Sequence, residues 1–299
     1  MITVSLVMSR IKELKDILDS YITSIIIQEE LPNEIKYALQ GGKEIRGTLA
    51  LFMADTLAGN PSVALPVAFA MELMHSASLI HDDIIDNSEL RRGRESFWKR
   101  YGLEKAIIFP HIMMATAIKY VAQAGIKAVL ESMDAWRNAA LGQIWDMEVL
   151  KGGKTSASYL DIISKKTGVV FEAASVLPLY ALNFEEKAVK EARNYGLSLG
   201  RAYQILDDII DIEMGKKDSG SVVKLLEEAG EASHSYALKL FKNELDTLFR
   251  SSMSLSTQLA YYARYSLEVF LSECQDTSRR LFLDLIEARW DYWGLPAYQ

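Results

Sequence analysis

Residues 79–86 read LIHDDIID and residues 205–211 read ILDDIID, so the five letters DDIID occur twice in the chain. On a helix, the aspartates at the first and fifth positions of each run would lie one turn apart on the same face. Like charges at this spacing repel each other unless a cation neutralises them. Because Mg²⁺ binds few protein carboxylates and shares its other positions with phosphate oxygens, two such runs indicate a Mg²⁺-bridged diphosphate.

A single acidic run of this kind has another interpretation, because many such runs are solvated helix faces. The residues before each run argue against that interpretation here. Leu79-Ile80 precede the first run and Ile205-Leu206 precede the second, so both runs have apolar flanks. We expect both runs near the C-terminal ends of long helices, where the negative end of the helix dipole also favours bound cations.

Apolar residues recur at spacings of three and four along most of the chain, and there are only six prolines. This pattern predicts an all-α protein. The expected helices cover residues 8–29, 44–58, 61–86, 104–122, 125–150, 157–176, 185–213, 222–250, 254–273 and 277–290. The breaks between them are short, which predicts a single domain over residues 1–299.

Composition narrows the class of protein. The formal net charge of −7 argues against a general nucleic-acid-binding protein. No window reaches about eighteen uninterrupted apolar residues, and Met1–Met8 lacks a signal-peptide pattern, so we expect a soluble cytoplasmic protein and not an integral membrane protein. The single cysteine, Cys274, excludes an internal disulfide and favours a reducing compartment.

Three short basic clusters are candidates for binding phosphate. Residues 41–46 read GGKEIR and place Lys43 and Arg46 at a helix start, where anions bind well. Residues 91–94 read RRGR, and arginine suits bidentate phosphate recognition. Residues 165–168 read KKTG inside an apolar helix. From the residues alone, each cluster has another explanation: solvated side chains at a helix start for the first, a salt-bridge network for the second and a snorkelling surface lysine for the third.

In order and spacing, these motifs resemble the trans-isoprenyl diphosphate synthases, the polyprenyl synthetase family, and especially its geranylgeranyl diphosphate synthases of archaeal and eukaryotic type. The motifs that carry the resemblance are GGKEIR at 41–46, His75, LIHDDIIDNSELRRG at 79–93, Gly142-Gln143, Lys166-Thr167 and YQILDDIID at 203–211. The resemblance implies an isoprenoid-synthase-type antiparallel bundle of about ten helices around a deep central cavity, usually as a homodimer.

The resemblance also implies a reaction. An allylic diphosphate would bind through about three Mg²⁺ ions and ionise to a carbocation. The implied metal ligands are four aspartates, namely Asp82, Asp86, Asp207 and Asp211, the last through water. The implied cations on the same diphosphate are Arg91 and Lys166, with Lys216 or Lys217 closing the site. The side-chain dipoles of Thr167 and Gln204 would face the carbocation.

Isopentenyl diphosphate would occupy a second, metal-free site, and its double bond would attack the carbocation head to tail. The residues implied for this site are Lys43, Arg46, His75 and Arg92. Product length would depend on the pocket below the first acidic run, lined by Met74, Ala77 and Ser78. Because none of these three is aromatic, we expect geranylgeranyl diphosphate or a longer product.

Several positions depart from the family pattern. Gly47 replaces a common proline, Glu95 and Trp98 stand where proline and histidine are common, and the loop after Asp211 is short, with no Gly-Lys-Thr segment before Lys224. These departures leave open a non-catalytic, regulatory subunit of a prenyl diphosphate synthase. A class I terpene cyclase is a third candidate, although it needs no second diphosphate site.

Overall fold

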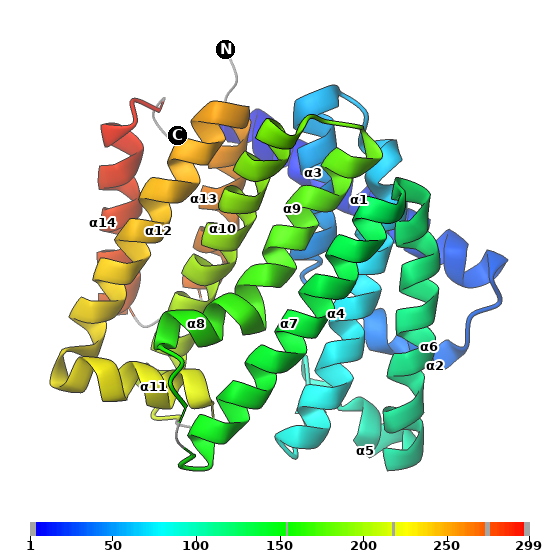
Figure 1. The fold of residues 1–299 in the computed structure, drawn as a ribbon, viewed down its shortest axis with the longest axis horizontal. Coiled ribbons are helices and arrows are strands. Elements are labelled where there is room, and N and C mark those ends of the chain that lie inside the picture. Colours follow the sequence, from blue (N-terminus) through cyan, green and yellow to red (C-terminus); the bar gives the residue numbers. More distant parts are fainter. Residues whose placement is uncertain (1–3, 154, 217–218, 273–275, 296–299) are drawn as a thin grey trace. The chain divides into compact units, whose positions relative to one another are not determined.

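The computed structural model describes residues 4–153, 155–216, 219–272 and 276–295, and nearly all of its elements are helices (Figure 1). The strand pairing that these residues contain is a short antiparallel hairpin of β1 (Leu90–Arg91) and β2 (Arg94–Glu95). The prediction of an all-α fold from apolar periodicity is therefore confirmed.

The chain divides into two compact units. The N-terminal unit comprises Ile11–Ser132 and Leu177–Asn183, and the C-terminal unit comprises Met1–Arg10, Met133–Val176 and Phe184–Gln299. Three helices pass from one unit to the other, namely α1 (Val4–Gln28), α7 (Ile126–Leu150) and α9 (Val169–Ala181). The single domain over residues 1–299 stays a prediction.

The remaining elements belong to one unit or the other. The N-terminal unit contains α2 (Asn33–Leu39), α3 (Ile45–Ala58), η1 (Pro61–Ala64), α4 (Leu65–Ile85), β1, β2, α5 (Phe97–Tyr101), α6 (Leu103–Val121) and η2 (Ala122–Ala124). The C-terminal unit contains α8 (Tyr159–Ile163), the π-helical turn η3 (Ser164–Gly168), α10 (Glu186–Glu213), α11 (Gly220–Ala229), η4 (Gly230–Ala232), α12 (Ser233–Leu255), α13 (Gln258–Leu271) and α14 (Asp276–Tyr292).

Helix α4 is the core helix of the N-terminal unit and packs against α3 and α6. A proline in its first turn suits a helix start, because the missing N–H would have no partner there. The ring of Phe69 is fully buried and packs edge-on against Tyr120, with 4.9 Å between ring centroids. The helix ends at Ile85, so the first acidic run forms its last turn.

Helix α10 has the same role in the C-terminal unit and lies beside α12 (Figure 1). The ring of Tyr203 contacts Phe171 and Phe270, with centroid distances of 5.3 and 4.1 Å. The second acidic run falls in the last turns of α10, which ends at Glu213. Both runs therefore lie near the C-terminal ends of long helices, as the sequence predicts.

Two of the predicted helices are wrong in extent. The single helix expected over residues 222–250 is divided, because Gly230 leaves the helical conformation with φ 57° and ψ −133° and a 3₁₀ turn separates α11 from α12. The helix expected over residues 157–176 is also divided. Ser158 and Asp161 form a capping box at the start of α8, and the π-helical turn follows before α9.

Two helical segments, Pro61–Ile85 and Leu103–Ala124, are long and apolar enough to cross a membrane by length and composition alone. The first is 67% buried within the protein, which is typical of the core helix of a soluble protein. The second is 39% buried. Four of its large apolar side chains are exposed, namely Leu103, Ile107, Ile108 and Ile112.

Candidate active site

The first acidic run places its outer aspartates one helical turn apart at the end of α4. The backbone N–H of Asp86 donates to the carbonyl of Asp82 over 2.8 Å, which is the hydrogen bond of a helical turn. Asp82 is partly buried and Asp86 is exposed. The two residues are therefore one helical turn apart on one face, and their role as metal ligands stays a prediction.

The middle aspartate of this run has a different environment. Asp83 is 2% exposed, and its Oδ1 accepts from Nε of Arg91 over 2.8 Å and lies 2.6 Å from Nη2. Burial raises the pKa of Asp83 above its ordinary value, and the Arg91 guanidinium partly offsets that rise. Arg91 was predicted to contact the allylic diphosphate directly; here it contacts the acidic run, and its role at the diphosphate stays a prediction.

The hairpin that follows the first acidic run contains three arginines, one of which lies in its two-residue turn. Arg92 and Gly93 both have positive φ, 54° and 72°, and lie between the paired residues Arg91 and Arg94. Positive φ at both central residues is typical of the tight turns that join antiparallel strands. Arg92 therefore does not follow Arg91 to the acidic run. Its Nη1 instead donates to the carbonyl of Gln40 over 3.1 Å.

The four residues predicted for isopentenyl diphosphate all belong to the N-terminal unit. Nη1 of Arg46 lies 3.1 Å from Nε2 of His75, and a Cβ at Gly42 would lie 3.2 Å from Nη1 of Arg92. Lys43 is exposed in the same loop as Gly42. The structure thus brings Arg46 into contact with His75. Separately, it places the side chain of Arg92 against Gly42 of the GGKEIR loop.

The contact between Arg46 and His75 defines the state of the imidazole. A guanidinium can only donate, so Nε2 of His75 must accept and cannot carry a proton. Burial and the nearby Arg46 also lower the pKa of His75 well below its ordinary value. His75 is therefore neutral, and it orients Arg46 without adding positive charge.

Two of the departures from the family pattern have local partners in the structure. The N–H of Gly47, which a proline would lack, donates to Oε1 of the buried Glu72 over 2.7 Å. Burial raises the pKa of Glu72, and this hydrogen bond partly offsets the rise. Nε1 of Trp98 donates to the carbonyl of Ser88 over 2.8 Å. Both substitutions are accommodated by hydrogen bonds in the N-terminal unit.

The second acidic run lies in the C-terminal unit, on α10. Nε2 of Gln204 donates to Oδ2 of Asp207 over 3.2 Å, and Nζ of Lys216 lies 3.5 Å from Oδ1 of Asp211. Lys216 therefore lies beside the run, and its role as the closing cation stays a prediction. The alternative, Lys217, lies outside the described residues.

The middle aspartate of the second run is surrounded by neutral donors. Asp208 is 1% exposed; its Oδ2 accepts from the hydroxyl of Tyr159 over 2.8 Å. Its Oδ1 accepts from Ser221 Oγ over 2.9 Å and from Gln204 Nε2 over 3.0 Å. Burial, and then the charge of Asp207, raise the pKa of Asp208 to about 7.

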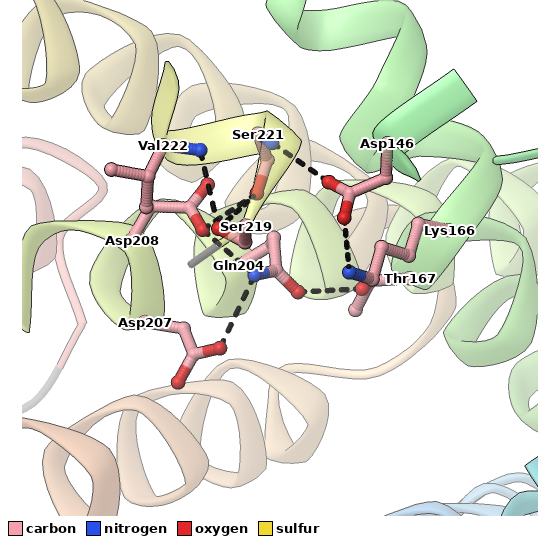
Figure 2. Close-up of polar contacts among 9 residues, drawn as sticks. All are labelled: Asp146, Lys166, Thr167, Gln204, Asp207, Asp208, Ser219, Ser221 and Val222. Atoms are coloured by element: carbon pink, nitrogen blue, oxygen red, sulfur yellow. Dashed lines mark hydrogen bonds and ion pairs between the residues drawn. The ribbon is translucent and has the colours of Figure 1, made fainter. Parts of the chain in front are cut away.

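The residues predicted to face the carbocation contact each other (Figure 2). The hydroxyl of Thr167 donates to Oε1 of Gln204 over 2.6 Å. The neighbouring Lys166 donates to Oδ2 of Asp146 over 2.9 Å. Sequence reasoning missed Asp146, although its position one helical turn after Gly142 would have placed it on the same face of α7.

The donor set fits Mg²⁺ bound together with phosphate. Among the described residues, no group of three or more histidine, cysteine, aspartate or glutamate side chains could hold a metal ion by itself. Each acidic run instead offers a pair of carboxylates at a spacing of four residues. Mg²⁺ is commonly held by one or two carboxylates, with waters and substrate phosphates in the remaining positions.

The positions predicted to set product length lie on α4. Met74 and Ala77 are buried, at 5% and 0% exposure, and Ser78 donates to the carbonyl of His75 over 2.8 Å. All three belong to the two turns before Asp82. Their part in setting product length stays a prediction.

Comparison with known proteins identifies the family. The family model described as polyprenyl synthetase matches residues 28–227 of the chain. The chain belongs to the polyprenyl synthetase family. A geranylfarnesyl diphosphate synthase of Natronomonas pharaonis is 31% identical to this chain over 225 residues, which cover 66% of each chain, just under two thirds.

Two further relatives extend the comparison along the chain. A geranylgeranyl diphosphate synthase of Sulfolobus acidocaldarius is 28% identical over 285 residues, covering 86% of this chain and 84% of the relative. The crystal structure of a geranyltranstransferase from Thermotoga maritima has a TM-score of 0.74 at 24% identity, covering 93% of this chain and 99% of the other. This structural likeness confirms the predicted isoprenoid-synthase fold.

Proposed function

We propose that this polyprenyl synthetase is an enzyme that condenses isopentenyl diphosphate head to tail with an allylic diphosphate in a Mg²⁺-dependent reaction. The products are a longer trans-polyprenyl diphosphate, geranylgeranyl diphosphate or longer, and pyrophosphate. The observation that carries this proposal is the pair of DDIID runs, each of which offers two carboxylates one helical turn apart beside a buried third. Family membership supports it independently.

The allylic diphosphate is the group that must leave. Asp82 and Asp86 of the N-terminal unit, and Asp207 and Asp211 of the C-terminal unit, would hold Mg²⁺, which when bound would supply positive charge to the leaving pyrophosphate. Lys166 and Lys216 add positive charge, and Asp146 holds the ammonium of Lys166 in place at 2.9 Å. The C–O bond breaks, and the dipoles of Thr167 and Gln204 stabilise the allylic carbocation that forms.

The second substrate requires its own diphosphate site. Lys43, Arg46 and Arg92 supply cations for isopentenyl diphosphate, and the neutral His75 orients Arg46. The double bond of isopentenyl diphosphate forms the new C–C bond, and a proton then leaves to the departed pyrophosphate. This cationic set favours a synthase over a terpene cyclase, which needs no second diphosphate.

We further propose a cytoplasmic homodimer. On α6, the exposed side chains of Leu103, Ile107, Ile108 and Ile112 are 48%, 50%, 56% and 39% accessible, and their spacing places them on one face of the helix. Contiguous exposed apolar residues commonly mark protein interfaces. Sedimentation velocity tests this proposal, and a monomer at micromolar concentration would contradict it.

A condensation assay tests the activity. The purified chain is incubated with Mg²⁺, isopentenyl diphosphate and allylic diphosphates of increasing length, and products are identified by mass spectrometry. A new polyprenyl diphosphate is expected, and its loss on chelation with EDTA tests the metal requirement. Activity only after a second synthase subunit is added would indicate a regulatory subunit. Consumption of the allylic diphosphate without isopentenyl diphosphate would indicate a terpene cyclase.

A further inference from the structure

Six residues of the C-terminal unit form a closed ring of polar contacts, which we call the polar ring (Figure 2). Its members are Lys166, Asp146, Ser221, Asp208, Gln204 and Thr167. We propose that Ser221 is a positioning residue, which joins the two aspartates of the ring and so fixes the cation of Lys166 and the amide of Gln204. The inference rests on the proposed function, because it assigns a role in the same site.

One half of the ring consists of the contacts that connect Lys166 with the start of α11. Oδ2 of Asp146 accepts from Nζ of Lys166 over 2.9 Å, and Oδ1 accepts from the backbone N–H of Ser221 over 2.7 Å. The hydroxyl of Ser221 then donates to Oδ1 of Asp208 over 2.9 Å. Ser221 thus uses its backbone for one aspartate and its side chain for the other.

The other half leads back to the lysine through the dipoles predicted to face the carbocation. Asp208 accepts from the amide nitrogen of Gln204 over 3.0 Å, and the amide oxygen of Gln204 accepts from Thr167 over 2.6 Å. Thr167 follows Lys166 in the chain, so the ring is closed by a peptide bond. Each predicted site residue in the ring is therefore held from two sides.

Two glycines allow the backbones to approach closely enough for this ring. A Cβ at Gly220 would overlap the carbonyl oxygen of Asp146, and a Cβ at Gly142 would overlap the backbone nitrogen of Lys166. Gly142 and Asp146 are one turn apart on α7, so one helix face contacts both the π-helical turn and the start of α11. The start of α11, which follows the second acidic run, thereby packs directly against Asp146.

Burial makes the ring sensitive to the loss of one member. Ser221 is fully buried, Asp208 is 1% exposed and Asp146 is 3% exposed. In such surroundings a fully satisfied polar network is rigid, and a broken one leaves buried groups without partners. Removal of the Ser221 hydroxyl breaks one link of the ring, while the backbone bond to Asp146 remains possible.

The test compares Ser221→Ala with Ser219→Ala. Ser219 is the matched control, because its hydroxyl accepts from the N–H of Val222 at the same helix start and lies 3.3 Å from the hydroxyl of Ser221, but forms no link of the ring. Three quantities are measured: Mg²⁺-dependent binding of inorganic pyrophosphate by calorimetry, kcat together with KM for isopentenyl diphosphate, and the melting temperature. A structural role alone would change mainly the melting temperature.

The expected result is specific to the ring. Ser221→Ala should weaken pyrophosphate binding and lower kcat by about 10-fold each, as is typical for residues that orient metal-site groups, and leave KM for isopentenyl diphosphate within about 2-fold. Ser219→Ala should change binding and kcat by less than about 2-fold, even if it lowers the melting temperature. Equal effects of the two substitutions on binding and kcat would overturn the proposal.

A second variant tests whether the ring acts as a unit. Asp146→Asn leaves one acceptor oxygen for two donors, Lys166 and the N–H of Ser221, and should therefore break one link of the ring. The double variant Asp146→Asn/Ser221→Ala should be little worse than Asp146→Asn alone. Effects that multiply would contradict a ring. A wild-type protein that binds pyrophosphate and makes no product would refute the proposed function while leaving the positioning role intact; one that does neither refutes both.

Discussion

The two acidic runs share five letters and differ in what surrounds their middle aspartate. Asp83 is paired with a cation, Arg91, which comes from a hairpin only a few residues later. Asp208 is held by the neutral side chains of Tyr159, Gln204 and Ser221, which come from three different helices. The comparison teaches that helix geometry sets the spacing of the outer carboxylates in both runs, whereas the pKa of the middle aspartate depends first on its burial and then on the groups around it, which differ between the runs.

The largest effect on activity should come from replacing an outer aspartate, and it should be similar in the two runs. Asp82→Asn and Asp207→Asn should each lower kcat/KM by at least about 100-fold, because each removes charge from the metal-diphosphate site. Steady-state kinetics measure this, with the exposed Asp134→Asn as the control. Retention of activity in either variant would break the symmetry between the runs.

The pH dependence of stability should show the effect of the middle aspartate of the second run, Asp208. The folded-state pKa of Asp208, about 7, is above its ordinary value of 3.8, so the folded protein binds more protons than the unfolded chain between these values. The contribution of Asp208 to stability is therefore greatest below about pH 4 and is lost as pH rises through about 7. Asp208→Asn should remove this part of the pH dependence.

Urea unfolding in metal-free buffer between pH 5 and pH 8 measures that dependence. The asparagine amide can still accept from Gln204 and Ser221 and can donate to the hydroxyl of Tyr159, so the fold should persist. Asp83→Asn serves as the comparison and should keep the slope that Asp208 causes. An unchanged slope in Asp208→Asn would show that another group causes it.

Removing the charge of the middle aspartate should lower the free energy of unfolding more at the first run than at the second. Asp83→Asn leaves the Arg91 guanidinium without its carboxylate, and we expect a loss of about 1–2 kcal/mol, limited by the 38% exposure of the Arg91 side chain. Asp208→Asn should cost less at pH 8, where it removes a buried ionised group. Equilibrium unfolding of both variants at pH 8 checks the order, and the reverse order would refute the comparison.

The smallest effect should come from a single neutral donor. Tyr159→Phe removes one of the three hydrogen bonds to Asp208 and should lower the free energy of unfolding by about 0.5–1.5 kcal/mol. Because this bond lowers the pKa of Asp208, its loss should raise that pKa further. The midpoint of the pH-dependent stability change should therefore move to higher pH, and a shift to lower pH would contradict this assignment.

Apolar periodicity predicted α4 and α10 and thereby placed both acidic runs at helix ends. It could not predict the hairpin of Leu90–Arg91 with Arg94–Glu95, since strands of two residues are too short to show alternation. The contacts of Asp208 with Tyr159 and of Asp146 with Ser221 join residues far apart in the chain. Such contacts leave no local pattern, so the polar ring could be found only in the structure.

The π-helical turn at Ser164–Gly168 has a consequence for how this family can change in length. Such a turn usually occurs singly inside α-helices and often at functional sites. A π-helical turn takes up one residue more than an α-helical turn, so deleting one of its residues would restore α-helical winding and leave the side chains that follow, up to Ala181, on nearly the same faces. We therefore expect a one-residue deletion in this turn to move Lys166 and Thr167 while the packing of α9 is kept.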